Sequence, residues 1–147
     1  FIELYKRCSK AQITFYGGTE ERLEELRNRY DLPPTIQFKG IVDEVPYHLH
    51  QCYLSASFTE LFANACVEAL NQGLLALLSD VEIAHRFYAD QSDAIRLFRN
   101  KAQLIQMIEE MEQADYRQSN AENIALAAHY SLGTVAQSYR ELLDRNF

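Results

Sequence analysis

The chain has 147 residues, of which 48% are hydrophobic and 12% aromatic, so it can form one domain with a sizeable core and is not a disordered segment. Its formal net charge of −7 leaves no basic patch to neutralise phosphates, and we expect no nucleic-acid partner. The sequence contains no apolar run near the roughly 18 residues of a membrane span.

Three cysteines, Cys8, Cys52 and Cys66, are scattered without the spacing of metal ligands. Free thiols of this kind are typical of a reducing compartment, and we therefore expect a cytoplasmic protein. The sequence starts at Phe1 inside a helical pattern, and we expect a fragment or an excised domain.

The first third of the chain alternates between helix and strand patterns. The spacing of apolar residues in Phe1–Ser9 predicts the last turns of an amphipathic helix. Ala11–Tyr16 is rich in strand-forming residues and ends at Gly17-Gly18. Thr19 is a good N-cap for an amphipathic helix over Glu20–Tyr30.

A second short strand is predicted at Thr35–Phe38, because Pro33-Pro34 stops the preceding helix and Lys39-Gly40 closes the strand. Asp43–Gln51 then has the pattern of a short helix, with Pro46 in its first turn.

The middle of the chain reads as strand, loop, helix and strand. Tyr53–Ser55 can finish a strand, and Glu60–Gln72 has helical periodicity that ends at Gly73. Leu74–Leu78 is a continuous apolar run of the buried-strand type.

The last part of the sequence predicts one strand and several helices. We expect the strand at Ala94–Phe98 and the clearest helix at Lys101–Glu112. Further helical segments are predicted at Val81–Tyr88, Ala121–Tyr130 and Gly133–Leu143.

Short apolar strands that alternate with helices indicate βαβ units, so the fold class is α/β with a parallel sheet and right-handed crossovers. Ligands on such folds bind at the carboxyl ends of the strands. The loops after Tyr16, Phe38, Ser55 and Leu78 therefore share the edge where a ligand is expected.

The start of the central helix has the properties of an anion site. The main-chain N–H groups of Leu61, Phe62 and Ala63 would lie free at a helix N-terminus, where a phosphate can accept from them. From the residues alone, two plainer interpretations stay open. Glu60 can simply complement the helix dipole, and Glu68 can be a solvated surface residue.

The ordered set of motifs resembles the C-terminal half of a GT-B retaining glycosyltransferase of family 4, glycosyltransferase group 1. The resemblance runs from about Ile13 to the end of the chain. The motifs, in chain order, are a strand followed by Gly17-Gly18, a strand ending in Phe38-Lys39-Gly40, then Ser57, Glu60, Glu68, Ala69-Leu70, Gly73, an apolar strand and Ser79-Asp80.

This resemblance implies a fold, a reaction and partners. The fold would be a Rossmann-like three-layer αβα domain over residues 1–147, one half of a GT-B enzyme, without the N-terminal acceptor domain. This Rossmann-like domain, residues 1–147, would hold a nucleoside-diphosphate sugar, with UDP or GDP as nucleotide and with no cofactor or metal. The intact enzyme would transfer a hexosyl group, with retention, to a saccharide, lipid or protein.

The resemblance also assigns roles to individual residues. Glu60 would contact the hydroxyls of the donor sugar as the catalytic-site carboxylate, and Glu68 would bind the ribose hydroxyls. The amides of Leu61, Phe62 and Ala63 would hold the diphosphate. Three residues, Gly40, Ile41 and Val42, would approach the base through their backbone, with Gly17 on the same donor-binding edge.

Several features depart from the family pattern. Leu61 and Ala63 replace two glycines, and the Gly-Arg strand and Lys-Gly helix that supply cations to the leaving diphosphate are absent from this sequence. We therefore expect the isolated fragment to be inactive. The alternative function is a non-catalytic accessory or scaffold subunit. A receiver-like module is disfavoured because no acidic cluster follows Tyr16.

The resemblance implies that a strand is missing from the middle of the sheet, since the family's first strand lies upstream of Phe1. The chain would then form a homodimer or expose an apolar groove. Any membrane-surface association would belong to the missing N-terminal domain.

Overall fold

The computed structural model of the chain describes residues 11–57, 64–81, 95–113 and 120–141, except for positions 132, 135, 138 and 139. The chain divides into two compact units. The first comprises Phe1–Pro46 with Asn100–Ala114, and the second comprises Tyr47–Arg99 with Asp115–Phe147.

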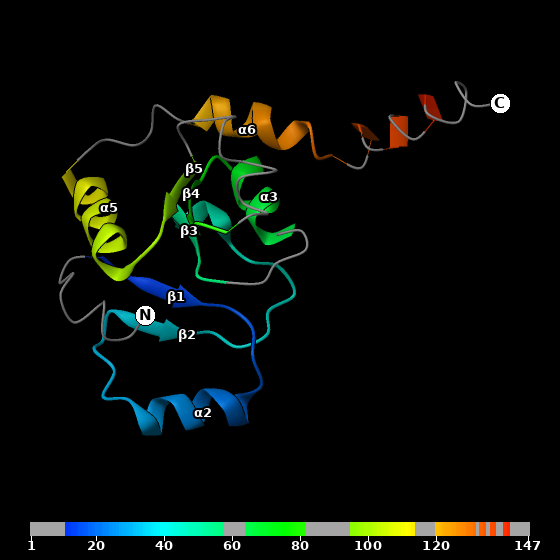
Figure 1. Cartoon of the computed structure of the whole chain (residues 1–147). Helices are drawn as coiled ribbons and strands as arrows, with labels where there is room; N and C mark the ends of the chain where they lie inside the picture. The colour runs from blue at the N-terminus through cyan, green and yellow to red at the C-terminus, as the bar shows by residue number, and fades with distance from the viewer. Residues whose placement is uncertain are drawn as a thin grey trace. The chain divides into compact units, whose positions relative to one another are not determined.

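The first unit contains a βαβ motif (Figure 1). Strands β1 (Ile13–Phe15) and β2 (Ile36–Phe38) pair in parallel, with Ile13 opposite Ile36. Helix α2 (Glu20–Arg29) connects them and begins at the predicted N-cap, where the Thr19 side chain accepts from the Arg22 N–H.

Side chains of this unit explain why these segments fold as they do. The rings of Phe15 and Phe38 stack across the strand pair with centroids 5.0 Å apart, and Leu23 of α2 is buried. Helix α5 (Lys101–Gln113) begins after Asn100, whose side chain accepts from the Gln103 N–H at 3.0 Å. Its Leu104 and Ile108 are buried, as expected of an amphipathic helix.

The second unit has a three-stranded parallel sheet in the order β3-β4-β5. All five residues of the central strand β4 are buried, so both faces of this strand are covered. The elements of this unit are η1 (Tyr47–Leu49), β3 (Cys52–Ser55), α3 (Asn64–Asn71), β4 (Leu75–Ser79), β5 (Ile95–Phe98) and α6 (Asn120–Ala128).

Helices α3 and α6 pack on each other and on this sheet. The core combines small and large apolar side chains from four elements, which lets the helices approach the sheet closely. Its buried members are Cys66, Leu70, Ala76, Leu78, Ile95, Leu126 and Ala127.

The junction between α3 and β4 is defined by main-chain hydrogen bonds. The Gly73 N–H donates to Leu70 O at 2.9 Å and the Leu74 N–H donates to Ala69 O at 3.0 Å, which together form a Schellman motif. Gly73 has φ +82°, so the predicted end of the helix at this glycine is confirmed.

Most predicted elements are confirmed, and two differ clearly. Asp43–Gln51 forms only the 3₁₀ turn η1, because Pro46 disfavours helical geometry at Val45. The described strands are parallel as predicted and form two sheets, since no ladder joins β1 or β2 to the other described strands; a sheet that lacks a middle strand, as expected from the sequence, would be divided in this way. The helix predicted at Ala121–Tyr130 is Asn120–Ala128 and ends in a turn.

Other predicted segments fall wholly or partly outside the described residues. Phe1–Ser9 does so entirely, as do the first four residues of Glu60–Gln72 and nearly all of Val81–Tyr88. The described positions between Gly133 and Glu141 are helical. Across the described part of the chain, the helices are all too short or too polar to cross a bilayer.

Asn123 joins α6 to the α3–β4 junction. Its side chain is fully buried, and its Nδ2 donates to Leu74 O at 2.7 Å and to Gly73 O at 3.4 Å. Two main-chain carbonyls in a buried place thus depend on one side-chain amide, so the amide is expected to contribute strongly to stability.

We predict that Asn123→Ala lowers the free energy of unfolding by about 1–3 kcal/mol, because buried carbonyls lose their donor. Asn123→Asp should cost more, since it places an acceptor against acceptors. Urea unfolding followed by circular dichroism measures both. Asn28→Ala, at an exposed position of α2, is the matched control and should change stability little. An unfolding midpoint for Asn123→Ala equal to that of Asn28→Ala would contradict the anchoring role.

Candidate functional site

The carboxyl ends of β1 and β2 are closed by their following loops. The Gly17 N–H donates to Gly40 O with an N···O distance of 2.5 Å, and the Lys39 N–H donates to Phe15 O at 2.9 Å. Two of the predicted donor-binding residues, Gly17 and Gly40, therefore come together as the sequence suggested.

Ile41 and Val42 follow this junction and differ from Gly40 in exposure. Gly40 is buried, whereas the Ile41 side chain is 78% exposed and that of Val42 is 37% exposed. Within the described part of the chain, no hydrogen bond engages the main-chain groups of Ile41 or Val42. Their main-chain N–H and C=O groups can therefore form hydrogen bonds with a ligand.

The second unit carries Glu68 on the outer side of α3. Cys66, Ala69 and Leu70 of this helix are buried, whereas Glu68 is exposed. Asn64, Glu68 and Gln72 form a polar stripe on this helix, because they are spaced four residues apart and all three positions are exposed. Ala65 is exposed as well, since it lies beside the polar stripe near the start of the described helix.

A tyrosine from η1 contacts this glutamate. The Tyr47 hydroxyl donates to Glu68 Oε2 at 3.0 Å and lies 3.4 Å from Ala65 O. Burial of the tyrosine, followed by its hydrogen bond to the Glu68 carboxylate, raises the pKa of Tyr47 above its usual value. The hydroxyl thus stays protonated at neutral pH and acts as a donor.

Sequence spacing does not indicate this contact, because Tyr47 and Glu68 lie 21 positions apart in different elements. The sequence feature that could have pointed to this contact is the segment of mixed polar and apolar residues around Pro46, directly before a predicted strand. Neither its register nor its 3₁₀ geometry could be read from spacing.

Polar side chains also gather where β3, β4 and β5 end. The Ser79 hydroxyl donates to Ser55 O at 3.5 Å, and the Asp80 N–H donates to Phe98 O at 2.9 Å. The exposed Arg99 guanidinium donates through Nε to Asp80 Oδ2, and this contact raises the pKa of Arg99. Arg99 is a cation at this edge that the sequence reasoning missed, although it directly follows a predicted strand.

Four of the predicted site residues, Glu60, Leu61, Phe62 and Ala63, lie outside the described residues. The structure therefore describes the helix that follows them, from Asn64, and leaves their roles as predictions.

The described cysteines and the described acidic and histidine side chains can be assessed as nucleophiles and as metal ligands. Burial raises the pKa of the Cys66 thiol to about 12, and that of Cys52 to about 12 as well, so neither supplies a thiolate nucleophile at neutral pH. No group of three or more histidine, cysteine, aspartate or glutamate side chains gathers to hold a metal within the ranges that the structure describes.

The comparison with protein families gives a clear result. The model of the family described as Glycosyl transferases group 1 matches residues 1–113. The fold class and the family predicted from the motifs are confirmed. No curated protein matches the chain significantly.

Three solved structures share the fold over 98% of this chain. The pneumococcal O-GlcNAc transferase GtfA in complex with UDP and GlcNAc has a TM-score of 0.70 and 20% identity. Sucrose-phosphate synthase from Thermosynechococcus elongatus has a TM-score of 0.71 and 18% identity, and a GtfA/B complex has 0.78 and 20%. The chain spans only 31% of the first and third chains and 41% of the second.

The backbone conformation of Gly17 can be tested by substitution. Gly17 has φ +94° and a Cβ placed on it would meet nothing within 4 Å, so a side chain there adds backbone strain without a clash. We predict that Gly17→Ala destabilises the protein by about 1 kcal/mol. Gly133→Ala, at a helical position outside the set of positive-φ glycines, should be neutral or stabilising. Equal unfolding temperatures for the two variants would contradict this assignment of strain.

Proposed function

The chain belongs to the glycosyl transferases group 1, and on that premise we propose that it is the donor-binding domain of a glycosyltransferase. The intact enzyme transfers a hexosyl group from a nucleoside-diphosphate sugar to an acceptor with retention of configuration. The observation that carries this proposal is the Glu68 carboxylate, exposed on α3 and held through Oε2 by Tyr47.

In this proposal Glu68 binds the ribose of the donor. A carboxylate only accepts hydrogen bonds, and the vicinal hydroxyls of a ribose donate to it with good geometry. No partner of Glu68 Oε1 is found among the described residues, so this oxygen can accept a ligand hydroxyl. An exposed carboxylate supported by a hydroxyl suits a ligand better than it suits a purely solvated helix face.

The main chain of Ile41 and Val42 is proposed to read the edge of the base. An unengaged peptide edge offers one donor and one acceptor per residue, which matches the hydrogen-bonding edge of a nucleobase. Uracil is the first base to test, because the similar pneumococcal GtfA structure is named as a complex with UDP and GlcNAc. Guanine is the second.

The diphosphate and the sugar are assigned to the start of the central helix. Main-chain N–H groups of Leu61, Phe62 and Ala63 would donate to the diphosphate, where the helix dipole favours negative charge. Glu60 would hold hydroxyls of the sugar. A carboxylate at a helix N-terminus is kept ionised and weakly basic, so Glu60 acts by binding and not as a general base.

The acceptor, a saccharide, lipid or protein, is assigned to a second domain of the intact enzyme, as is any association with a membrane surface. A homodimer is retained as a proposed assembly. A cytoplasmic location suits both the free thiols and an unmodified nucleotide-sugar donor.

A non-catalytic accessory subunit is the second candidate function. It is favoured by Leu61 and Ala63, which stand where the family has glycines, because a side chain there hinders close approach of a sugar diphosphate. The similarity to a structure described as a GtfA/B complex is compatible with a subunit of either kind. Turnover by the intact protein with a nucleotide sugar distinguishes the two functions.

Glu68→Ala should weaken UDP binding by about 1–3 kcal/mol, the range for lost hydrogen bonds to a charged acceptor. Isothermal titration calorimetry on the intact protein measures the change. Glu109→Ala, an exposed carboxylate on α5, should bind UDP as the wild type does. Wild-type affinity in Glu68→Ala would remove the ribose role.

We further predict a metal-independent reaction, because the loops at the strand ends lack an Asp-x-Asp pair and a helix N-terminus can hold a diphosphate without a cation. Activity of the intact enzyme should survive EDTA, and product NMR should show the anomeric configuration of the donor. Activity that is lost on chelation and restored by magnesium or manganese would exclude the metal-free reaction, and an inverted product would exclude retention.

A further inference from the structure

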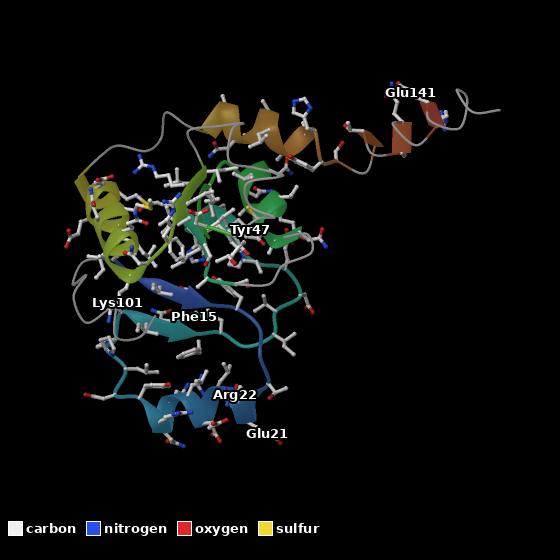
Figure 2. The ribbon with its side chains drawn as sticks, viewed as in Figure 1. Phe15, Glu21, Arg22, Tyr47, Lys101 and Glu141 are labelled. Carbon is white, nitrogen blue, oxygen red and sulfur yellow. The ribbon has the colours of Figure 1, made fainter. Side chains whose placement is uncertain are left out.

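Tyr47 and Glu68 form a contact between two elements that are otherwise distant in the sequence (Tyr47 is labelled in Figure 2). The tyrosine lies in the short η1 turn before β3, and the glutamate lies on α3. Their hydrogen bond of 3.0 Å uses Oε2 of the carboxylate, which leaves one oxygen of the same carboxylate for other hydroxyls.

The tyrosine is itself held in place. The His50 N–H donates to Tyr47 O at 2.9 Å and so closes the 3₁₀ turn. Pro46 precedes Tyr47 with a fixed φ, which restricts the entry into this turn. The ring is half-buried, so few orientations of the hydroxyl relative to α3 remain available.

The glutamate, in contrast, is flexible on its own. It is exposed on the helix surface, and its side chain has three rotatable bonds whose freedom must be lost when a ligand binds. A hydroxyl that already fixes one carboxylate oxygen reduces this loss, which is the general basis of preorganisation.

We propose that Tyr47 is a positioning residue for ribose recognition, which orients the Glu68 carboxylate so that its second oxygen accepts the ribose hydroxyls. Tyr47 thereby contributes to the preference for ribonucleotides over deoxyribonucleotides without touching the nucleotide. The inference rests on the ribose-binding role proposed for Glu68 and adds a residue that has no counterpart in the motifs of the sequence.

The protonation of Tyr47 supports this role. Burial and the neighbouring carboxylate raise the pKa of its hydroxyl further above neutrality, so the hydroxyl is protonated at neutral pH and can donate to Glu68. An exposed tyrosine would provide the same group with much less orientation.

The alternative is that Tyr47 only stabilises the fold. Tyr47→Phe keeps the ring and removes one oxygen, so a purely structural role would change the affinity for all nucleotides by the same factor. A positioning role would change affinity only for nucleotides whose ribose hydroxyls reach Glu68. The ratio of the two affinities separates these roles.

The experiment is calorimetric titration of the intact protein with UDP and with 2′-deoxy-UDP. Tyr47→Phe should weaken UDP binding by about 5-fold, as for one lost hydrogen bond, and should weaken 2′-deoxy-UDP binding less, because only the 3′-hydroxyl of that nucleotide can reach Glu68. Glu68→Ala should lose more of the preference, and the double variant should match Glu68→Ala. Tyr130→Phe, a half-buried tyrosine packed on the core of the same unit, is the matched control and should keep the wild-type preference.

The outcomes separate the two proposals. A Tyr47→Phe protein that keeps the wild-type preference, or loses both affinities equally, overturns the positioning role while Glu68→Ala still abolishes the preference. A Glu68→Ala protein with the wild-type preference overturns the ribose role of Glu68, and the role of Tyr47 falls with it.

Discussion

The burial of β4 on both faces is the constraint on which the second unit depends. Ala76 and Leu78 belong to the core with α3 and α6, whereas Leu75 and Leu77, which alternate to the other face, are buried as well. Each fully buried leucine contributes about 1.5–3 kcal/mol by leaving water. The face with Ala76 and Leu78 is covered because α3 presents Cys66, Ala69 and Leu70 to the sheet. The rotation of α3 about its own axis is therefore fixed, and Glu68 is placed on the exposed side as a consequence of core packing.

Core packing places the Cα of Glu68 but does not orient its carboxylate, because an exposed glutamate samples several rotamers. The hydrogen bond from Tyr47, which lies on η1 outside the apolar core, restricts the orientation of this carboxylate. At the far end of α3, Asn123 and the Schellman motif hold the turn into β4. The helix is thus fixed at its C-terminal end by main-chain hydrogen bonds and by the Asn123 amide, whereas one side-chain hydrogen bond from η1 engages the Glu68 carboxylate.

The sequence predicted the features that depend on local pattern. Strand β4 was visible as an apolar run, the end of α3 as Gly73, and the start of α2 as Thr19. It failed where long-range contacts decide the structure. The partner of Glu68 is 21 positions away, and Asn123 reads as an ordinary polar residue of a helix although it is fully buried. The division into two sheets and the single turn of η1 also depend on tertiary context that periodicity does not contain. The functional hypothesis came from the order of motifs and not from any one of them.

Donor binding and catalytic turnover place different demands on this domain. For donor binding, the proposed function needs only a carboxylate for the ribose, the role proposed for Glu68, and a peptide edge for the base, the role proposed for Ile41 and Val42. Turnover needs in addition that charge developing on the leaving diphosphate be stabilised, and only interactions stronger in the transition state accelerate a reaction. Arg99 is a described cation that directly follows β5. Its guanidinium already donates to Asp80. In the proposed function Leu61 and Ala63 bear on the same step, because a side chain in place of a glycine hinders the close approach of a backbone to a diphosphate. A subunit that kept the groups for nucleotide binding and lost those that stabilise the leaving diphosphate would bind a nucleotide sugar without transferring the sugar. Nucleotide affinity alone would then not measure catalysis.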